Sequence, residues 1–322
     1  MNAITVYEHG GPEVLKWGTA PDPEPGPGEI LVKVTAAGVN FIDVYQRTGL
    51  NPVGLPSIPG IEGAGDVVRT GSGVEDFSAG DRAAWCSVRG SYAEYAAVPA
   101  ARAVSVPEGL STDLAAAALL QGATAHYLVN DTFPLQPGHV CLVHAAAGGA
   151  GRLLVQMAKR AGATVIATAG GPEKVELART AGADHVIDYR AEDFAVAVEA
   201  LVGKNRLDVV YDGVGKATFE KSMTLLRPRG MMVTYGNASG PPDPIAPLRL
   251  NQLGSIFLTR PGLVHHIAST EELRQRAEAV YSLITDGDLD VLIGLRLPLA
   301  EAAEAHRRLE ARQTTGKVLL EP

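Results

Sequence analysis

Cysteine is scarce in this chain of 322 residues, which contains only Cys86 and Cys141. The two lie far apart and show no C-x-x-C spacing, so they can build neither a disulfide framework nor a cysteine-rich zinc site. We expect both to be reduced thiols that pack in the interior.

Long hydrophobic runs are also missing. No stretch of about 18 apolar residues is available to cross a bilayer. The first residues, MNAITVYEHGG, lack the basic start and the apolar core of a secretion signal. We therefore expect a cytoplasmic protein that is neither exported nor embedded in a membrane.

Positive charge is in deficit, because 28 Lys and Arg residues stand against 36 Asp and Glu residues, for a net charge of −8. No cluster of Lys and Arg offers a local attraction for a polyanion. Nucleic acid is therefore not an expected partner.

What remains is the composition of an ordinary globular protein, with 46% hydrophobic and 20% charged residues. Single cores usually stop growing near ~250 residues. The length therefore predicts two domains, each with its own core.

The first part of the chain predicts a β-rich domain, a small barrel or sandwich. Short apolar runs at residues 30–34, 65–68, 82–85 and 92–98 are separated by Pro/Gly turns such as residues 21–28.

From His139 the pattern changes to strand, glycine turn and helix, repeated five times, and residues 254–259 are interpreted as a sixth strand. Nearly continuous apolar strands in such alternation predict an α/β fold of the doubly wound Rossmann type, a parallel sheet with helices on both faces.

Helices are predicted at residues 112–120 and 270–286, and the residues from Gln121 onward are predicted to lead into a second helix. A strand-helix-strand tail ending in GKVLLEP is expected to return to the first domain. The expected domains are residues 1–122 with 265–322, and residues 123–264.

A glycine-rich turn, AAGGAG at residues 146–151, directly follows a predicted strand and opens an amphipathic helix. This context favours a dinucleotide site, in which small residues let the backbone approach a pyrophosphate at the helix N-terminus. Ala146 stands where the first glycine would be. The alternative is a turn that only permits tight packing of helix and strand.

The choice of nucleotide depends on the end of the second strand of this domain, where NAD enzymes usually carry an acid against the ribose 2′-hydroxyl. Residues 168–171 are TAGG and contain no acid, and Lys174 follows one turn into the next helix. NADP(H) is therefore favoured. Tyr189 and Arg190 are candidates to border the adenosine end and its phosphate, and all three could also be ordinary surface residues.

These motifs together resemble the medium-chain dehydrogenase/reductase superfamily, and within it the quinone oxidoreductase branch that includes ζ-crystallin. The resemblance implies a β-rich GroES-like barrel domain beside the Rossmann domain. It rests on the segments AAGVNFIDVYQRTG (36–49), PGIEGAGDV (59–67), GDRAAW (80–85), HAAAGGAG (144–151), YDGVG (211–215), YGNASG (235–240), TRP (259–261) and TTGKVLL (314–320).

Zinc alcohol dehydrogenases of this superfamily carry a cysteine ligand in the segment matching GVNFID and a histidine in the segment matching PGIEG. Asn40 and Ile61 occupy those positions here, and neither side chain replaces thiolate or imidazole. We therefore expect no metal site. Reduction of an electrophilic π-system by NADPH, which needs a delivered hydride and stabilisation of the resulting charge, is the implied chemistry.

By resemblance, Asn40, Asp43 and Tyr45 form the catalytic end, with Asn40 and Tyr45 placed to hydrogen-bond the substrate or nicotinamide and Tyr45 as candidate proton donor. Gln121 and Thr124 are expected near the nicotinamide. Each of these could instead satisfy local backbone groups, and Thr124 could cap a helix. The other implied cofactor contacts are Gly148, Gly149, Ala150, Gly151, Gly170, Lys174, Tyr189, Val214, Asn237, Ser239, Gly316 and Lys317.

The implied function is an NADPH-dependent, zinc-independent quinone reductase that transfers a hydride or electrons to small quinones. An NADPH-dependent alkenal or enoyl-thioester reductase is a second hypothesis, and a non-catalytic NADPH-binding protein with a structural or RNA-binding role is a third. The strand at residues 254–259, if it forms the edge of the sheet, predicts pairing with its own copy across a two-fold axis. We expect a homodimer, with a tetramer as the alternative.

Overall fold

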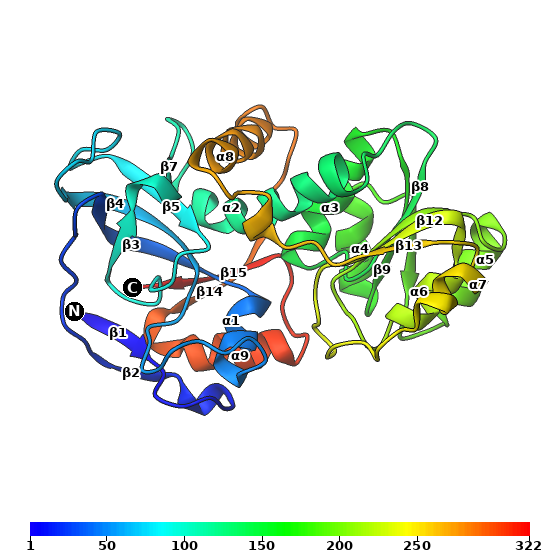
Figure 1. Ribbon diagram of the computed structural model, residues 1–322, viewed down its shortest axis with the longest axis horizontal. Coiled ribbons are helices and arrows are strands. Elements are labelled where there is room, and N and C mark those ends of the chain that lie inside the picture. The colour runs from blue at the N-terminus through cyan, green and yellow to red at the C-terminus, as the bar shows by residue number, and fades with distance from the viewer. The chain divides into compact units, whose positions relative to one another are not determined.

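The computed structural model describes all 322 residues. The chain forms two compact units, one of Met1–Ala123 with Ile267–Pro322 and one of Thr124–His266. The first unit contains both chain ends, blue and red in Figure 1. No helix combines the length and apolar character that a membrane span requires.

The first unit is built on a seven-stranded sheet with the order β14-β15-β3-β4-β5-β7, and β6 also pairs with β3; β1 and β2 form a separate antiparallel pair. The long β3 alternates buried side chains into the core, among them Ile30, Val32 and Val34. The strands are β1 (Asn2–Thr5), β2 (Lys16–Thr19), β3 (Glu29–Val39), β4 (Glu62–Thr70), β5 (Arg82–Cys86), β6 (Tyr95–Pro99), β7 (Ala103–Ser105), β14 (Ile293–Pro298) and β15 (Lys317–Glu321).

The strand predicted at residues 92–98 begins three residues later in the structure, as β6. Before it, the Ser91 and Tyr92 amides donate to the Gly60 and Pro59 carbonyls, so this segment is tied to the loop before β4 and not to the β3 ladder. The fully buried Tyr92 ring then lies against Gly60, where a Cβ would come within 2.2 Å of it.

The C-terminal tail returns to the first unit, because β15 pairs antiparallel with β3. The register places Val318 opposite Val39 and Leu319 opposite Gly38. This pairing brings Lys317 beside the end of β3, although the two segments are far apart in the sequence.

Four α-helices belong wholly or mainly to the first unit: α1 (Phe41–Thr48), α2 (Thr112–Tyr127), α8 (Thr270–Thr285) and α9 (Ala302–Glu310). The prediction of separate helices before and after Gln121 is wrong, since α2 is continuous. Gly122 does not end the helix; it gives room to Val280 of α8, whose Cγ1 would lie 2.6 Å from a Cβ there.

The second unit is a six-stranded parallel sheet with the order β10-β9-β8-β11-β12-β13, which confirms the Rossmann prediction. The sixth strand exists but is shorter than expected, because Gly254 and Ser255 have positive φ angles of 98° and 56° and cannot extend it. The strands are β8 (Val140–Val143), β9 (Thr164–Ala169), β10 (His185–Asp188), β11 (Leu207–Asp212), β12 (Leu226–Thr234) and β13 (Phe257–Thr259).

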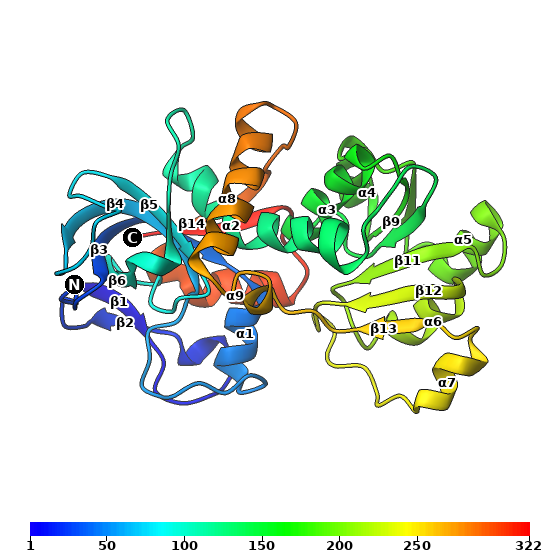
Figure 2. The same ribbon diagram turned by 45° about the horizontal axis from the view of Figure 1, so that its top comes forward.

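Helices cover both faces of this sheet, with α3 and α4 on one side and α6 on the other (Figure 2). Phe194 of α5 and Met223 of α6 pack in one buried cluster with strand residues such as Leu142. The helices are α3 (Gly149–Arg160), α4 (Pro172–Thr180), α5 (Phe194–Val202), α6 (Phe219–Thr224) and α7 (Pro247–Gln252).

Candidate functional site

The glycine-rich turn between β8 and α3 is tightly folded and carries almost no side-chain atoms. Gly148 is the residue before α3, and Gly149, Ala150 and Gly151 form the first turn of the helix. A Cβ on Gly151 would lie 2.3 Å from the Ala145 carbonyl oxygen, so this position accepts only glycine. The turn therefore presents the N-terminus of a 12-residue helix to an approaching anion, as a dinucleotide pyrophosphate requires.

Ala146 stands where the first glycine of the motif would be. Ala145, the preceding residue, adopts a positive φ of 53°, which L side chains rarely do. The Ala146 amide donates to the Thr168 carbonyl at 3.0 Å, which ties the turn to the end of β9.

A buried histidine that the sequence analysis did not consider lies at the base of this turn. His144 Nδ1 is 2.9 Å from Thr168 Oγ1, and His144 Nε2 is 2.9 Å from Ser222 Oγ. Because Ser222 donates to the Thr218 carbonyl, Nε2 carries the proton and Nδ1 accepts from Thr168. Burial lowers the pKa of His144, so the neutral ring holds the ends of β8 and β9 to α6.

The ends of β9 and β10 form a second edge of the candidate nucleotide site. A Cβ on Gly170 would come within 2.4 Å of the Tyr189 hydroxyl, and one on Gly171 would come within 3.2 Å of Arg190 Nη1. Asp188 Oδ1 accepts from the Gly171 and Arg190 amides at 3.0 and 2.9 Å. These backbone hydrogen bonds lower the pKa of Asp188.

Lys174 lies in the first turn of α4 and is half-buried. With Arg190 beside Gly171, it gives this edge two cations, while the end of β9 contributes no carboxylate. The arrangement fits a phosphate group better than a bare ribose hydroxyl.

The ends of β11 and β12 form the third part of this edge. Buried Asp212 accepts from the Val214 and Gly215 amides at 2.7 and 3.0 Å. The Ser239 hydroxyl donates to the Val214 carbonyl at 2.8 Å, and Asn237 Cα would lie 3.3 Å from a Cβ on Gly215. Val214, Asn237 and Ser239 are thus brought together, with Asp212 as a support that the sequence analysis missed.

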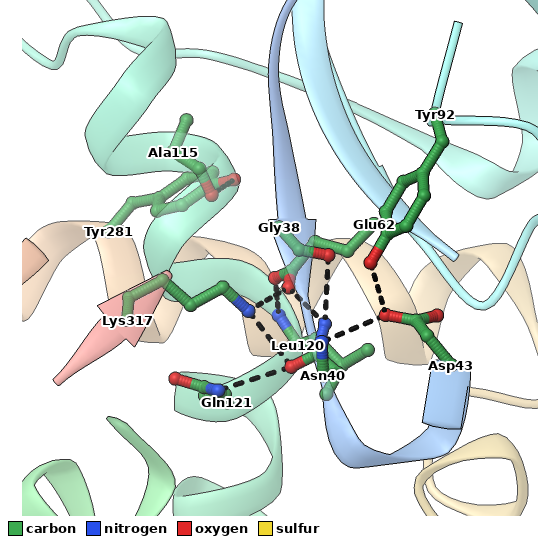
Figure 3. Close-up of polar contacts among 10 residues, drawn as sticks. All are labelled: Gly38, Asn40, Asp43, Glu62, Tyr92, Ala115, Leu120, Gln121, Tyr281 and Lys317. Carbon is green, nitrogen blue, oxygen red and sulfur yellow. Dashed lines mark hydrogen bonds and ion pairs between the residues drawn. The ribbon is translucent and has the colours of Figure 1, made fainter. Parts of the chain in front are cut away.

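In the first unit, a buried polar cluster surrounds Asn40 (Figure 3). Lys317 Nζ donates to Asn40 Oδ1 at 2.9 Å and to Glu62 Oε2 at 2.5 Å. Asn40 Nδ2 donates to Glu62 Oε2 at 2.8 Å and to the Gly38 carbonyl at 3.3 Å. Gln121 Nε2 donates to Asn40 Oδ1 at 3.1 Å.

Every hydrogen-bonding position of the Asn40 amide is therefore used within the first unit. Its oxygen accepts from Lys317 and Gln121, and its nitrogen donates to Glu62 and Gly38. The predicted hydrogen bond from Asn40 to substrate or nicotinamide would have to displace one of these partners. Lys317, also predicted as a cofactor contact, is 1% exposed with its ammonium on Glu62.

Asp43 lies in the first turn of α1 and is fully buried. Its Oδ2 accepts from the Asn40 amide at 2.8 Å and from the Tyr92 hydroxyl at 3.2 Å, while Oδ1 has no partner. Burial raises the pKa of Asp43 to about 7. Because it accepts from the backbone amide at the start of α1, the Asp43 carboxyl supports this helix.

A hydrogen-bond chain extends from Asp43 to the rim of the first unit. Tyr92 Oη lies 3.2 Å from His306 Nε2, and Arg47 Nη1 lies 3.3 Å from His306 Nδ1. Arg47 also pairs with Glu310 through two hydrogen bonds of 2.9 and 2.8 Å. Burial and Arg47 lower the pKa of His306 to about 3, so this histidine is neutral.

The remaining predicted residues have simpler surroundings. Tyr45 is half-buried on α1, with its ring centroid 6.1 Å from that of Phe41. Thr124 is 9% exposed on α2. A Cβ on Gly316 would lie 2.2 Å from the Leu292 carbonyl oxygen, so this glycine is needed for close approach of the chain before β14.

The predicted residues thus fall into two sets. One lines the strand ends of the second unit, and the other includes Asp43, Gln121 and Lys317, which hydrogen bonds join to Asn40 in the first unit. Sequence reasoning missed Glu62, Tyr92 and His306, whose only signal is a polar residue within a buried segment. No group of three or more His, Cys, Asp or Glu side chains is arranged to hold a metal ion.

Two family models match parts of the chain. Residues 26–108 match the family described as alcohol dehydrogenase GroES-like domain. Residues 149–282 match the family described as zinc-binding dehydrogenase.

Full-length relatives are more specific. The chain is 44% identical to a quinone oxidoreductase of Pseudomonas aeruginosa over 99% of each chain. It is 40% identical to a 2-haloacrylate reductase of a Burkholderia species, covering 99% of this chain and 98% of the relative. The structure of Escherichia coli quinone oxidoreductase complexed with NADPH superposes over all of both chains with a TM-score of 0.97 at 40% identity. The chain therefore belongs to the quinone oxidoreductase branch of the medium-chain dehydrogenase/reductase superfamily.

Proposed function

We propose that this protein is an NADPH-dependent quinone reductase. The observation that carries the proposal is the full-length match, at 40% identity, to a quinone oxidoreductase complexed with NADPH. The side-chain-free turn at Gly148–Gly151 supports it, because the turn fits a pyrophosphate. The cationic edge of Lys174 and Arg190 supports NADPH over NADH.

Within this proposal, the second unit binds the nucleotide. Backbone amides of the turn and the N-terminus of α3 hold the pyrophosphate. Lys174, Arg190 and Tyr189 hold the 2′-phosphate and the adenosine end. Gly170, Val214, Asn237 and Ser239 border the rest of the cofactor, and Thr124, Gln121, Gly316 and Lys317 belong to the nicotinamide end.

When bound, NADPH supplies the hydride that reduces the quinone. The chain's own residues orient the reactants and manage the proton. Tyr45 is the proposed proton donor to the reduced oxygen, since its hydroxyl belongs to a half-buried side chain on α1. Asn40 and Asp43 hold the start of α1 in place and thereby position Tyr45.

An activated alkene is the second candidate substrate, because a full-length relative at 40% identity is a 2-haloacrylate reductase. Such a substrate also needs a hydride at carbon and a proton. The same residues would serve both reactions, and the choice between them depends on the shape of the substrate pocket.

The proposed assembly is a homodimer in a cytoplasmic setting. β13 forms one edge of the parallel sheet, and Phe257 on it is 57% exposed. An unpaired strand edge carrying an exposed aromatic side chain is suited to antiparallel pairing with its own copy. Sedimentation of the wild type and of Phe257→Glu tests this: loss of the dimer is expected, because a charged side chain replaces the exposed aromatic one at the pairing edge.

The function is tested by steady-state oxidation of NADPH with 1,4-benzoquinone, a 1,2-naphthoquinone, a 2-haloacrylate and an alkenal. We expect the highest kcat/KM with the quinones. Activity confined to the alkenes would select the second candidate, and tight NADPH binding without oxidation by any acceptor would support a binding or structural role.

The role of Tyr45 has its own test. Tyr45→Phe is expected to lower kcat for quinone by about 100-fold or more, because general acid catalysis typically contributes about 10²- to 10⁴-fold, while NADPH binding is retained. Full turnover in this variant with both quinone and alkenal would exclude Tyr45 as the proton donor.

A further inference from the structure

In the buried cluster around Asn40, the charged residues Lys317 and Glu62 determine the direction of the hydrogen bonds. A lysine ammonium can only donate hydrogen bonds, and a carboxylate can only accept them. Lys317 therefore requires the oxygen of the Asn40 amide to face it, and Glu62 requires the nitrogen. The orientation of the Asn40 amide follows from these charges.

The orientation of the Asn40 amide in turn determines the orientation of the Gln121 amide. Asn40 Oδ1 already accepts from Lys317, and it can accept from Gln121 only if Gln121 presents its amide nitrogen. The Gln121 oxygen, Oε1, is left pointing elsewhere (Figure 3). Oε1 is buried and has no hydrogen-bond partner.

The backbone at Gln121 is held by the same group. The amide of Leu120, the preceding residue of α2, donates to Glu62 Oε1 at 2.6 Å. Glu62 thus fixes the helix just before Gln121 with one oxygen and the amide of Asn40 with the other. Glu62 and Lys317 are 0% and 1% exposed, so water does not compete for these contacts.

We propose that the Glu62–Lys317 pair positions Gln121 so that its Oε1 faces away from Asn40 as a hydrogen-bond acceptor. The group that donates to this oxygen is the carboxamide N–H of the bound nicotinamide. The inference rests on the proposed NADPH function. An unpaired buried acceptor is unfavourable, because it has lost its hydrogen bonds to water and gained none in the protein. A ligand that brings an N–H to Gln121 recovers this cost, and a ligand that brings a second acceptor or a methyl group does not.

The experiment compares NADPH with reduced 3-acetylpyridine adenine dinucleotide phosphate, in which a methyl ketone replaces the carboxamide and removes both N–H donors. Dissociation constants are measured by titration calorimetry without substrate. We expect the wild type to prefer NADPH by about 10-fold. Gln121→Leu, which removes the acceptor, is expected to reduce the preference to about 1-fold.

Two further variants test the part played by the charged pair. Glu62→Gln/Lys317→Met replaces both charges with neutral groups of similar size, and it should also lose most of the preference. Lys317→Arg keeps a group that only donates, and it should retain the preference. Lys33→Met, an exposed lysine of β3, is the matched control and should bind both nucleotides as the wild type does.

The outcomes separate this inference from the function on which it rests. Equal affinity of the wild type for the two nucleotides, or full preference in the doubly neutral variant with its fold intact by thermal unfolding, overturns the positioning role. If the doubly neutral variant does not fold, Gln121→Leu decides alone, and a retained preference there overturns the inference. Failure of the wild type to bind either nucleotide overturns the proposed function itself.

Discussion

The two candidate site regions are built in opposite ways. In the second unit the turn at Gly148–Gly151, where the pyrophosphate is proposed to bind, consists of backbone and small residues and contributes no polar side chain. In the first unit the site consists of fully buried side chains, with a Glu62–Lys317 ion pair around one amide. The turn in the second unit restricts the volume of the side chains that it can contain. The buried cluster in the first unit restricts which charges can be removed or added.

The comparison teaches which substitutions each region tolerates. A bare turn has no charge to lose but cannot accept an added methyl group where the backbone passes close by. A buried ion pair can accept a change of shape more easily than the loss of one partner, because the remaining charge has no solvent to stabilise it.

The largest expected effect is the removal of one charge from the first unit. Lys317→Met leaves Glu62 buried and unpaired, and it should lower the free energy of unfolding by about 3–5 kcal/mol. Chemical denaturation measures this loss. The doubly neutral Glu62→Gln/Lys317→Met should lose less than the single variant, and an equal or larger loss would contradict the account.

Added volume should be the main threat to the second unit. Gly151→Ala should destabilise the protein by about 1–3 kcal/mol and abolish nucleotide binding, since its Cβ would lie 2.3 Å from a backbone oxygen. Thermal unfolding and NADPH titration measure both effects. Gly148→Ala, whose Cβ would lie 3.3 Å from the same oxygen, should cost less, and Gly18→Ala, with nothing within 4 Å, is the control.

In the second unit, the charge that is expected to select the nucleotide lies at the edge formed by the ends of β9 and β10. Lys174→Glu should weaken NADPH binding by about 10- to 100-fold through lost pairing with the 2′-phosphate and leave NADH nearly unaffected. Lys204→Glu, an exposed lysine of the same unit, is the matched control. Equal losses for both nucleotides would remove Lys174 from the phosphate site.

The smallest expected effect between two neighbouring conditions, on the order of 1 kcal/mol for each pH unit, is a pH dependence in the first unit. Burial raises the pKa of Asp43 from 3.8 to about 7, so the folded protein binds this proton more tightly than the unfolded chain. The contribution is present in full below pH 4 and is lost as the pH rises toward 7, on the order of 1 kcal/mol per pH unit.

Asp43→Asn replaces the carboxyl with an amide that does not ionise. The free energy of unfolding of this variant, relative to that of the wild type, should therefore increase between pH 4 and pH 7. Urea unfolding at a series of pH values measures the difference. Asp66→Asn, an exposed carboxylate on β4, should show no such trend. A constant difference between wild type and Asp43→Asn would mean that Asp43 ionises normally.

The same contrast explains what could be predicted from the sequence. The Rossmann sheet and its glycine turn can be predicted from contiguous residues, because strands and helices alternate along the chain and AAGGAG joins the first strand to the first helix. The polar cluster is not contiguous: Asn40 and Lys317 are 277 positions apart. Only the pairing of β15 with β3 brings them together, and no local pattern shows that Glu62 lies between them.

Two predictions of secondary-structure boundaries were wrong, and a tertiary contact explains each of them. The break expected at Gln121 did not occur, because Gly122 serves close packing against Val280 and not a turn. The strand expected at residue 92 starts later, because the Tyr92 ring packs against Gly60 and its hydroxyl donates to Asp43. In both cases a tertiary contact outweighed a pattern that was correctly observed in the sequence.

The most direct test of the central claim is a single-turnover experiment. Chelator-treated protein is loaded with NADPH, or separately with NADH, and mixed rapidly with a 1,2-naphthoquinone while the absorbance of the reduced nicotinamide is followed. The account predicts fast oxidation of bound NADPH, much slower oxidation with NADH, and no effect of the chelator. Bound NADPH that stays reduced in the presence of the quinone would contradict it.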